Sequence, residues 1–208
     1  MGFTTKISGV FEVMSGSTLR HAVRCNLTVA ACFLAVHASA ATNFLALAQH
    51  EYRSALEASR RDPASATGAV ALAQAACQFA ELLPRDYDRE DVAKQGIEAA
   101  RAVISRQPTN AAAYYWLGNN LGELARTKSL GALSLVKEMA EALLRARELD
   151  DKTDHGGPDR SVGLLYRDAP GWPTSVGSTS KAKQHLQRAV QISPDFPENQ
   201  LCLLESYE

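Results

Sequence analysis

Hydrophobic residues recur at intervals of three to four positions through most of the chain, and no segment sustains the alternation of apolar and polar residues that is typical of a strand. Proline, glycine, asparagine or aspartate residues mark the connections between these periodic segments. The spacing predicts helices at about 45–58, 70–80, 90–104, 113–124, 135–149 and 178–193, with a short helix after Gly157-Pro158 and another after Pro197. Because the connections are mostly short, neighbouring helices should run antiparallel. The chain is therefore predicted to be all-α, a stack of antiparallel helical hairpins.

Small and large residues follow a fixed order within these predicted helices. The last full helix has small, large, small and apolar residues before a proline: Ala182, Leu186, Ala189, Ile192 and Pro194. A related order surrounds Gly118 and Gly163, where the missing side chain lets two helices approach closely. Both orders resemble the tetratricopeptide repeat (TPR), although the period exceeds the usual ~34 residues because of extra residues at 127–134 and 167–180. We therefore expect a degenerate TPR-like α-solenoid over residues 41–208.

The first forty residues have the features of a secretory signal peptide. Basic residues outnumber acidic ones in residues 1–26, an apolar run extends from Leu27 to Val36, and small residues surround Ala40. This combination is typical of export signals, and the run is too short to span a bilayer. We expect cleavage after Ala40 and a periplasmic or secreted protein, with residues 1–13 as an over-long start before Met14.

Two other interpretations of this segment stay open. The stretch from Val29 to Cys32 resembles a lipoprotein box in which Cys32 would carry the lipid, but almost no apolar core precedes it. Alternatively, the apolar run is an ordinary buried helix. Export with cleavage after Ala40 is the interpretation that the sequence favours.

Composition and motifs exclude some functions. The chain has 22 Lys and Arg against 23 Asp and Glu, so its net charge of −1 argues against a nucleic-acid binder. The sequence contains no nucleophile elbow, zinc-protease motif or phosphate-binding loop, so we expect a non-enzymatic protein without a cofactor. Cys77 and Cys202 lie on helices far apart in the sequence, and we expect two buried free thiols rather than a disulfide.

The segment 150–180 interrupts the repeat and is rich in acidic residues, glycine and proline. No metal is predicted, because four possible ligands fit neither a calcium loop nor a zinc site: Asp150, Asp151, Asp154 and His155. We expect acidic residues here to lie at helix ends, with Asp159 near the positive end of the next helix. Trp172 is expected to pack the loop onto the helices or, alternatively, to anchor a partner.

Four segments carry a resemblance to a known family over residues 66–208. They are Tyr114–Gly118, Ala146–Asp150, Gly156–Tyr166 and Ser180–Pro194. In these segments the chain resembles the T-component family of tripartite ATP-independent periplasmic (TRAP) transporters. The resemblance implies an exported, all-helical protein of degenerate TPR-like hairpins that assists a substrate-binding subunit and handles a hydrophobic ligand.

The sequence leads to two hypotheses of function. In the first, the stacked hairpins form a concave groove that binds a protein or peptide, such as the substrate-binding subunit of a TRAP-type system. In the second, an apolar pocket closed by the 167–180 loop holds a small hydrophobic ligand. Charged and amide residues along the groove would favour the first, and an enclosed apolar cavity would favour the second. Self-association into a homo-oligomer is compatible with both.

The candidate contact residues lie off the apolar faces of their helices or in the irregular segment. Asparagine side chains at such places can hydrogen-bond to a bound backbone. The candidates are Tyr115, Asn119, Asn120, Glu123, Asp159, Arg160 and Trp172. For those on the helix at 113–124, the alternative is a solvated outer face.

Overall fold

The computed structural model describes residues 43–128, 131–171 and 174–207. Residues 47–208 form one compact unit. A helix covers residues 43–61. Seven further helices follow it: α2 (Ala66–Leu82), α3 (Asp86–Arg106), α4 (Ala111–Arg126), α5 (Ala132–Leu149), α6 (Gly157–Asp168), α7 (Thr179–Ile192) and α8 (Pro197–Glu205). Within the described ranges no strand forms, and an isolated β-bridge joins Gly171 and Gly177.

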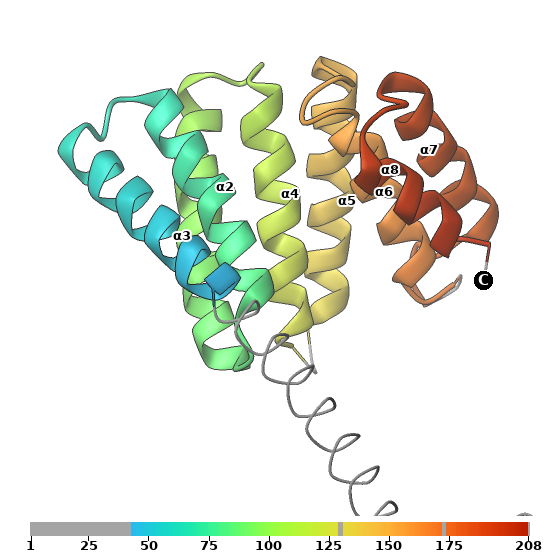
Figure 1. The fold of residues 1–208 in the computed structure, drawn as a ribbon, viewed down its shortest axis with the longest axis horizontal. Coiled ribbons are helices and arrows are strands. Elements are labelled where there is room, and N and C mark those ends of the chain that lie inside the picture. Colours follow the sequence, from blue (N-terminus) through green and yellow to red (C-terminus); the bar gives the residue numbers. More distant parts are fainter. Residues whose placement is uncertain (1–42, 129–130, 172–173, 208) are drawn as a thin grey trace, which may run out of the picture. The chain divides into compact units, whose positions relative to one another are not determined.

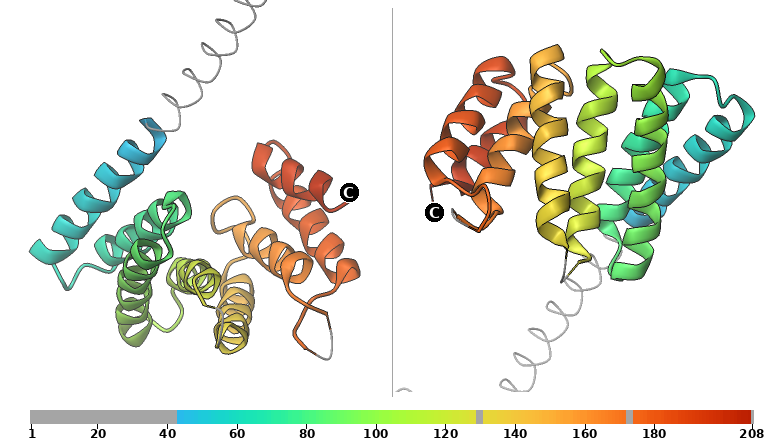
Figure 2. Two further views of the ribbon diagram at one scale, coloured as in Figure 1. Left: turned by 90° about the horizontal axis from the view of Figure 1, so that it is seen from below. Right: turned by 180° about the vertical axis from the view of Figure 1, so that it is seen from behind.

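The helices stack as hairpins in two layers. α2 packs on α3, α4 on α5 and α6 on α7, and each hairpin also contacts the next helix along the chain. The alternate helices α2, α4, α6 and α8 contact one another in succession and form the inner layer, while α3, α5 and α7 form the outer layer (Figure 1; Figure 2, left). The predicted all-α stack of helical hairpins is confirmed.

Capping side chains and prolines set the helix ends. Ser65 Oγ accepts a hydrogen bond from the Gly68 amide at 3.1 Å, and Asn110 Oδ1 accepts one from the Ala113 amide at 3.0 Å. Such bonds satisfy amides that have no partner within the helix. Prolines stand in the first turns of α6 and α8, where no amide hydrogen is needed. With their ends fixed in this way, the observed helices match the predicted helical segments one by one.

Two glycines, each without a side chain where the partner helix packs, bring the helices of a hairpin close together; we call these positions glycine notches. A Cβ atom on Gly118 of α4 would lie 2.6 Å from the side chain of Leu143 on α5, and a Cβ atom on Gly163 of α6 would lie 2.6 Å from that of Leu186 on α7. Both leucines are fully buried. The same pairing of glycine and leucine thus recurs in two successive hairpins, as the predicted close approach at these glycines requires.

Several predictions fall outside the described residues: the signal peptide, its cleavage after Ala40, the lipid attachment at Cys32 and the position of Trp172. None of the described helices is both long enough and apolar enough to cross a membrane. Cys202 is buried and Cys77 half-buried, and both thiols are free as predicted. Cys77 stays partly exposed because it faces the groove described next.

Candidate functional site

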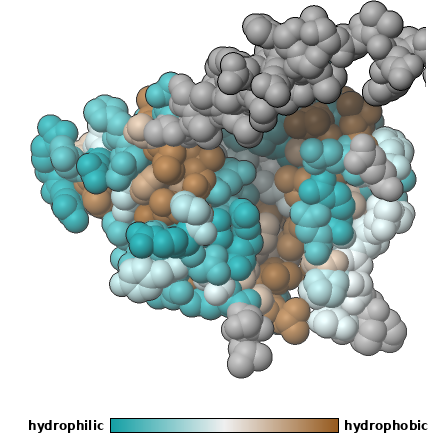
Figure 3. All heavy atoms as spheres, turned by 60° about the horizontal axis from the view of Figure 1, so that its bottom comes forward, coloured by the Kyte–Doolittle hydropathy of each residue, from teal (hydrophilic) through white to brown (hydrophobic). Residues whose placement is uncertain are grey.

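A groove of about 900 Å³ runs along the inner layer from α2 to α8. Side chains from α2, α4, α6 and α8 line it, and the N-terminal half of α5 and the start of the loop after α6 complete its wall. A smaller hollow of about 550 Å³ lies between residues 50–58 and α2, and Gln78 borders both spaces. In Figure 3 hydrophobic residues gather in the recess at the centre of the view, with hydrophilic residues on either side.

A buried arginine organises one end of the groove. Arg160 is 3% exposed, and its Nη2 donates to Asp154 Oδ2 at 2.6 Å and to the Tyr115 hydroxyl at 3.2 Å. Its Nη1 donates to Asn199 Oδ1 at 2.9 Å and to the Asp154 carbonyl at 3.3 Å, and its Nε lies 3.5 Å from Glu198 Oε1. The Tyr115 hydroxyl in turn donates to Asp154 Oδ2 at 2.7 Å. All the donor nitrogens of Arg160 therefore face acceptors, so the cluster ties α4, α6 and α8 together.

An unusual backbone presents Asp154 to this arginine. Asp154 and His155 have φ values of 49° and 59°, and Gly156 follows at 82°. Two successive non-glycine residues in the left-handed region are costly, and such strain persists where surrounding contacts impose it. Here the His155 ring stacks on Phe196 at 4.5 Å, and the Arg160 guanidinium lies 5.1 Å from the centre of the same ring. These contacts hold the turn in place at the edge of the groove.

A second charged cluster lies at the α2 end. Arg126 Nη1 donates to both carboxylate oxygens of Glu123, at 3.0 and 3.1 Å, and Arg89 Nε lies 3.6 Å from Glu123 Oε2. Burial raises the pKa of Glu123, and the negative charge of Glu81 adds to the rise, whereas both arginines oppose it. Burial of the sulfur atom also raises the pKa of the neighbouring Cys77 thiol.

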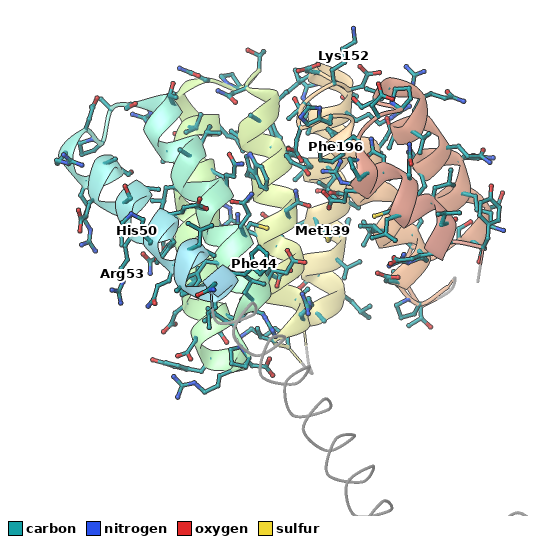
Figure 4. All side chains as sticks on the ribbon, in the orientation of Figure 1. Phe44, His50, Arg53, Met139, Lys152 and Phe196 are labelled. Carbon is teal, nitrogen blue, oxygen red and sulfur yellow. The ribbon has the colours of Figure 1, made fainter. Side chains whose placement is uncertain are left out.

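Apolar side chains form the floor between the two charged clusters. They come from α4, α5 and α6: Trp116, Val136, Met139, Leu164 and Leu165. Gly122 widens the floor, because it places no side chain beside Met139. Met139 lies on this floor and Phe196 at the Arg160 end of the groove (Figure 4). The groove therefore offers an apolar surface flanked by charge at both ends.

Four of the predicted contact residues line this groove. They are Tyr115, Asn119, Glu123 and Arg160. Tyr115 and Arg160 serve mainly to build the wall, since both are almost fully buried. Asn119 and Glu123 keep some exposure. Their contact with a partner stays a prediction.

Asn120 and Asp159 lie elsewhere, inside the helix stack, and both are fully buried. Asn120 Nδ2 donates to the Ala73 carbonyl at 2.8 Å and to the Trp116 carbonyl at 2.7 Å, so this side chain joins α4 to α2. It fits there because Gly96 on α3 leaves the space open. A partner in the groove cannot reach Asn120 without opening the stack.

Asp159 joins three helices. It lies in the first turn of α6, the place expected for it at the positive end of the helix. Its Oδ1 accepts from Arg147 Nε of α5 at 2.9 Å and lies 2.6 Å from His185 Nδ1 of α7. This carboxylate thus packs one hairpin against the next, and it does not face the groove.

The acidic residues before α6 also have structural partners. Asp150 Oδ1 accepts from the Lys152 amide at 3.0 Å, and Asp151 Oδ2 accepts from Arg188 Nη2 at 3.0 Å. Across the part of the chain that the structure describes, no three His, Cys, Asp or Glu side chains are grouped so that they could hold a metal ion. These residues shape the turn between α5 and α6.

Sequence reasoning missed three residues that build the Arg160 end of the groove: Phe196, Glu198 and Asn199. Only the turn signal at Pro197 marked this region, and nothing in the local pattern connects it with Arg160, about forty positions earlier. The one available signal was Asn199 itself, an amide on the buried face of the helix predicted after Pro197, and sequence reasoning did not use it.

Comparison with known proteins supports the fold. No family model and no curated protein matches the sequence. The structure is similar to the crystal structure of TTC0263, a thermophilic TPR protein in Thermus thermophilus, with a TM-score of 0.59 and 17% sequence identity over 80% of this chain and 81% of that chain. The fold is of the TPR type. The degenerate helical repeat expected from the spacing of small and large residues is thus confirmed at the level of architecture.

Proposed function

We propose that this protein is a non-enzymatic scaffold whose inner groove binds a segment of a partner protein. The lining of the groove is the observation that carries the proposal. Nine of its side chains are charged or amides, and they come from all four inner helices and the turn before α6: Gln78, Glu81, Asn119, Glu123, Arg126, Asp154, Arg160, Asp168 and Glu198. A curved stack of helices presents such a surface to an extended chain. Polar groups along it can pair with the backbone of that chain.

The apolar floor is the observation that favours a second candidate, a small hydrophobic ligand. Such ligands are usually enclosed on most sides. The 167–180 loop would have to provide the cover, yet its described residues turn back on α6: the Gly177 amide donates to the Pro170 carbonyl at 2.9 Å and the Ser178 amide to the Tyr166 carbonyl at 2.8 Å. The described residues of this loop that line the groove, 168–170, all lie at its start. The protein segment is therefore the better occupant.

The resemblance to TRAP T-components supports a more specific proposal. It extends through α4 and α6, the two inner helices that carry the central part of the groove. We propose that the protein is exported and assists the substrate-binding subunit of a TRAP-type system. Genes for transporter subunits beside this one would support that role. Failure of a purified neighbouring substrate-binding subunit to bind this protein would exclude it.

A substitution that fills the groove tests the scaffold proposal. Asn119 lines the groove and is partly exposed, so Asn119→Trp places a large side chain in the space without opening the helix stack. Lys137→Trp is the matched control, because Lys137 is exposed on α5 and lies outside the lining. We expect 12-residue peptides selected from a phage-displayed random library to lose at least ~10-fold in affinity with the first variant and little with the second.

Circular dichroism should show the same helical content in both variants. Peptides that bind the unaltered protein and both variants equally well would place the binding site elsewhere. Failure to select any peptide would overturn the proposal.

A further inference from the structure

The charges in the groove are unevenly matched. Its lining has two arginines, Arg126 and Arg160, and five carboxylates: Glu81, Glu123, Asp154, Asp168 and Glu198. A partner that buries these groups must compensate the excess negative charge, because unpaired buried carboxylates are costly. The excess therefore restricts the chemistry of the segment that the groove can accept.

Both arginines of the lining already pair with carboxylates of the protein itself. Arg160 directs all its nitrogens at acceptors of the protein itself, as described above. Arg126 Nη1 donates to both oxygens of Glu123. A carboxylate entering the groove would have to displace Asp154 or Glu198 from the buried Arg160 or share Arg126 with Glu123, and it would also meet the remaining negative charges. An acidic segment is thus disfavoured.

Two carboxylates remain open to a cation, one toward each end of the groove. Glu81 on α2 is exposed and forms no ion pair with any described residue. Glu198 on α8 has a side chain 57% exposed, and its Oε1 is 3.5 Å from Arg160 Nε, at the limit of a hydrogen bond. The other three are paired: Glu123 with Arg126, Asp154 with Arg160, and Asp168 with Arg167 at 2.6 Å.

The apolar floor lies between these two carboxylates. An occupant that matches the groove must therefore combine positive charge at both ends with an apolar side chain in the middle. Complementary charge both selects the partner and speeds its association.

Building on the scaffold function proposed above, we infer that the groove binds an extended, basic protein segment. One Lys or Arg of the segment pairs with Glu81, another pairs with Glu198, and an apolar side chain between them contacts Trp116 and Met139 on the floor.

Peptide selection with matched charge variants tests this inference. We expect peptides selected on the full chain to be enriched in Lys and Arg around an apolar residue. Fluorescence polarisation with a synthetic copy of a selected peptide should show an affinity loss of about 2- to 5-fold for Glu81→Gln and for Glu198→Gln, the range for exposed ion pairs. The double variant should lose about tenfold, and the loss should shrink in high salt.

The control removes the same charge from outside the groove. Glu98 on α3 and Glu141 on α5 are exposed, and neither lines the groove. Glu98→Gln with Glu141→Gln should leave the affinity unchanged. If both double variants lose the same affinity for the peptide, the effect comes from the net charge of the protein and not from the groove, and the inference is overturned.

The two proposals fail in different ways. If the selected peptides are uncharged or acidic and Asn119→Trp blocks their binding, the groove binds a protein segment but not a basic one. That result would overturn the further inference and leave the scaffold function intact. Absence of any groove-binding peptide would overturn both.

Discussion

The hairpin of α2 and α3 meets α4 around a buried apolar cluster, whereas the hairpin of α4 and α5 meets α6 around buried charged residues. At the first junction Ala69, Val103 and Ala113 form a buried cluster, with Asn120 as the buried amide nearby. At the second, the buried Asp159 and Arg160 pair with the less buried Arg147 and Asp154. An apolar junction tolerates small changes in shape, but a polar one cannot lose a member without leaving a buried group unpaired. The two junctions should therefore respond very differently to substitution.

The largest effect is expected at the polar junction. Arg160→Met keeps much of the volume but leaves Asp154 and Asn199 without their main partner. Breaking a buried ion pair from one side costs about 3–5 kcal/mol of unfolding free energy. Urea denaturation followed by circular dichroism should show this loss. Arg145→Met is the control: its pair with Glu148 is exposed, and such pairs contribute at most about 1 kcal/mol. Similar losses in both variants would show that the Arg160 cluster does not hold the junction.

The glycine notches within the hairpins should give the next largest effect. A Cβ atom on Gly118 would overlap the buried Leu143, so Gly118→Ala should cost about 1–3 kcal/mol and Gly118→Leu should unfold the array. Gly163→Ala, facing Leu186, should cost about as much as Gly118→Ala, because a Cβ atom at either glycine would lie 2.6 Å from a buried leucine side chain.

Gly122 is a matched control on the same helix, one turn later. A Cβ atom there would lie 3.2 Å from the end of the flexible Met139 side chain, which can move aside. Gly122→Ala should therefore be neutral or stabilise the protein by up to about 1 kcal/mol through helix propensity. Thermal denaturation distinguishes these cases, and equal melting temperatures for Gly118→Ala and Gly122→Ala would contradict the close approach at Gly118.

The two buried asparagines compare the apolar junction with the Arg160 cluster, because Asn120 lies at the first and Asn199 belongs to the second. Asn199 accepts from Arg160 and donates to three backbone carbonyls, whereas Asn120 donates to two and accepts from no described residue. Hydrogen bonds to a charged group contribute about 1.5–3 kcal/mol and neutral ones about 1 kcal/mol. Asn199→Ala should therefore destabilise the protein more than Asn120→Ala in urea denaturation. The reverse order would show that the apolar junction depends more strongly on its amide.

The apolar part of this architecture could be predicted from the sequence, because periodicity and small residues report directly on which helix faces are buried. The helices and the contacts at Gly118 and Gly163 follow from that pattern. Polar burial could not be predicted in the same way. Asn120 and Asp159 were assigned to a partner surface because polar residues usually face solvent, and their true partners depend on the packing of other helices. The Gly96 notch opposite Asn120 was the available signal, and it lies on the preceding helix of the chain.

The smallest predicted effect belongs to a partly exposed ion-pair cluster beside the apolar junction. Hydrogen bonds from Lys128 and Lys94 lower the pKa of Glu90 from its usual value of 4.5 to about 2. Lys128 follows α4 and Glu90 lies on α3, so their contact at 2.6 Å links the two helices beside this junction. A carboxyl with a lowered pKa stabilises the folded state fully above pH 4.5, and the contribution is lost as the pH falls toward 2.

Glu90→Gln should therefore reduce the dependence of the melting temperature on pH between these two values. The change should be modest and should diminish in high salt, because all three side chains are partly exposed to solvent. Glu98→Gln on the same helix is the control, since Glu98 forms no ion pair with a described residue, and it should leave the pH dependence as it is. If both variants lose stability in acid as steeply as the unaltered protein, the lysines do not hold Glu90 in the folded state. In that case the Glu90 pair adds nothing to the contact between α3 and α4, and the contrast between the two junctions becomes sharper.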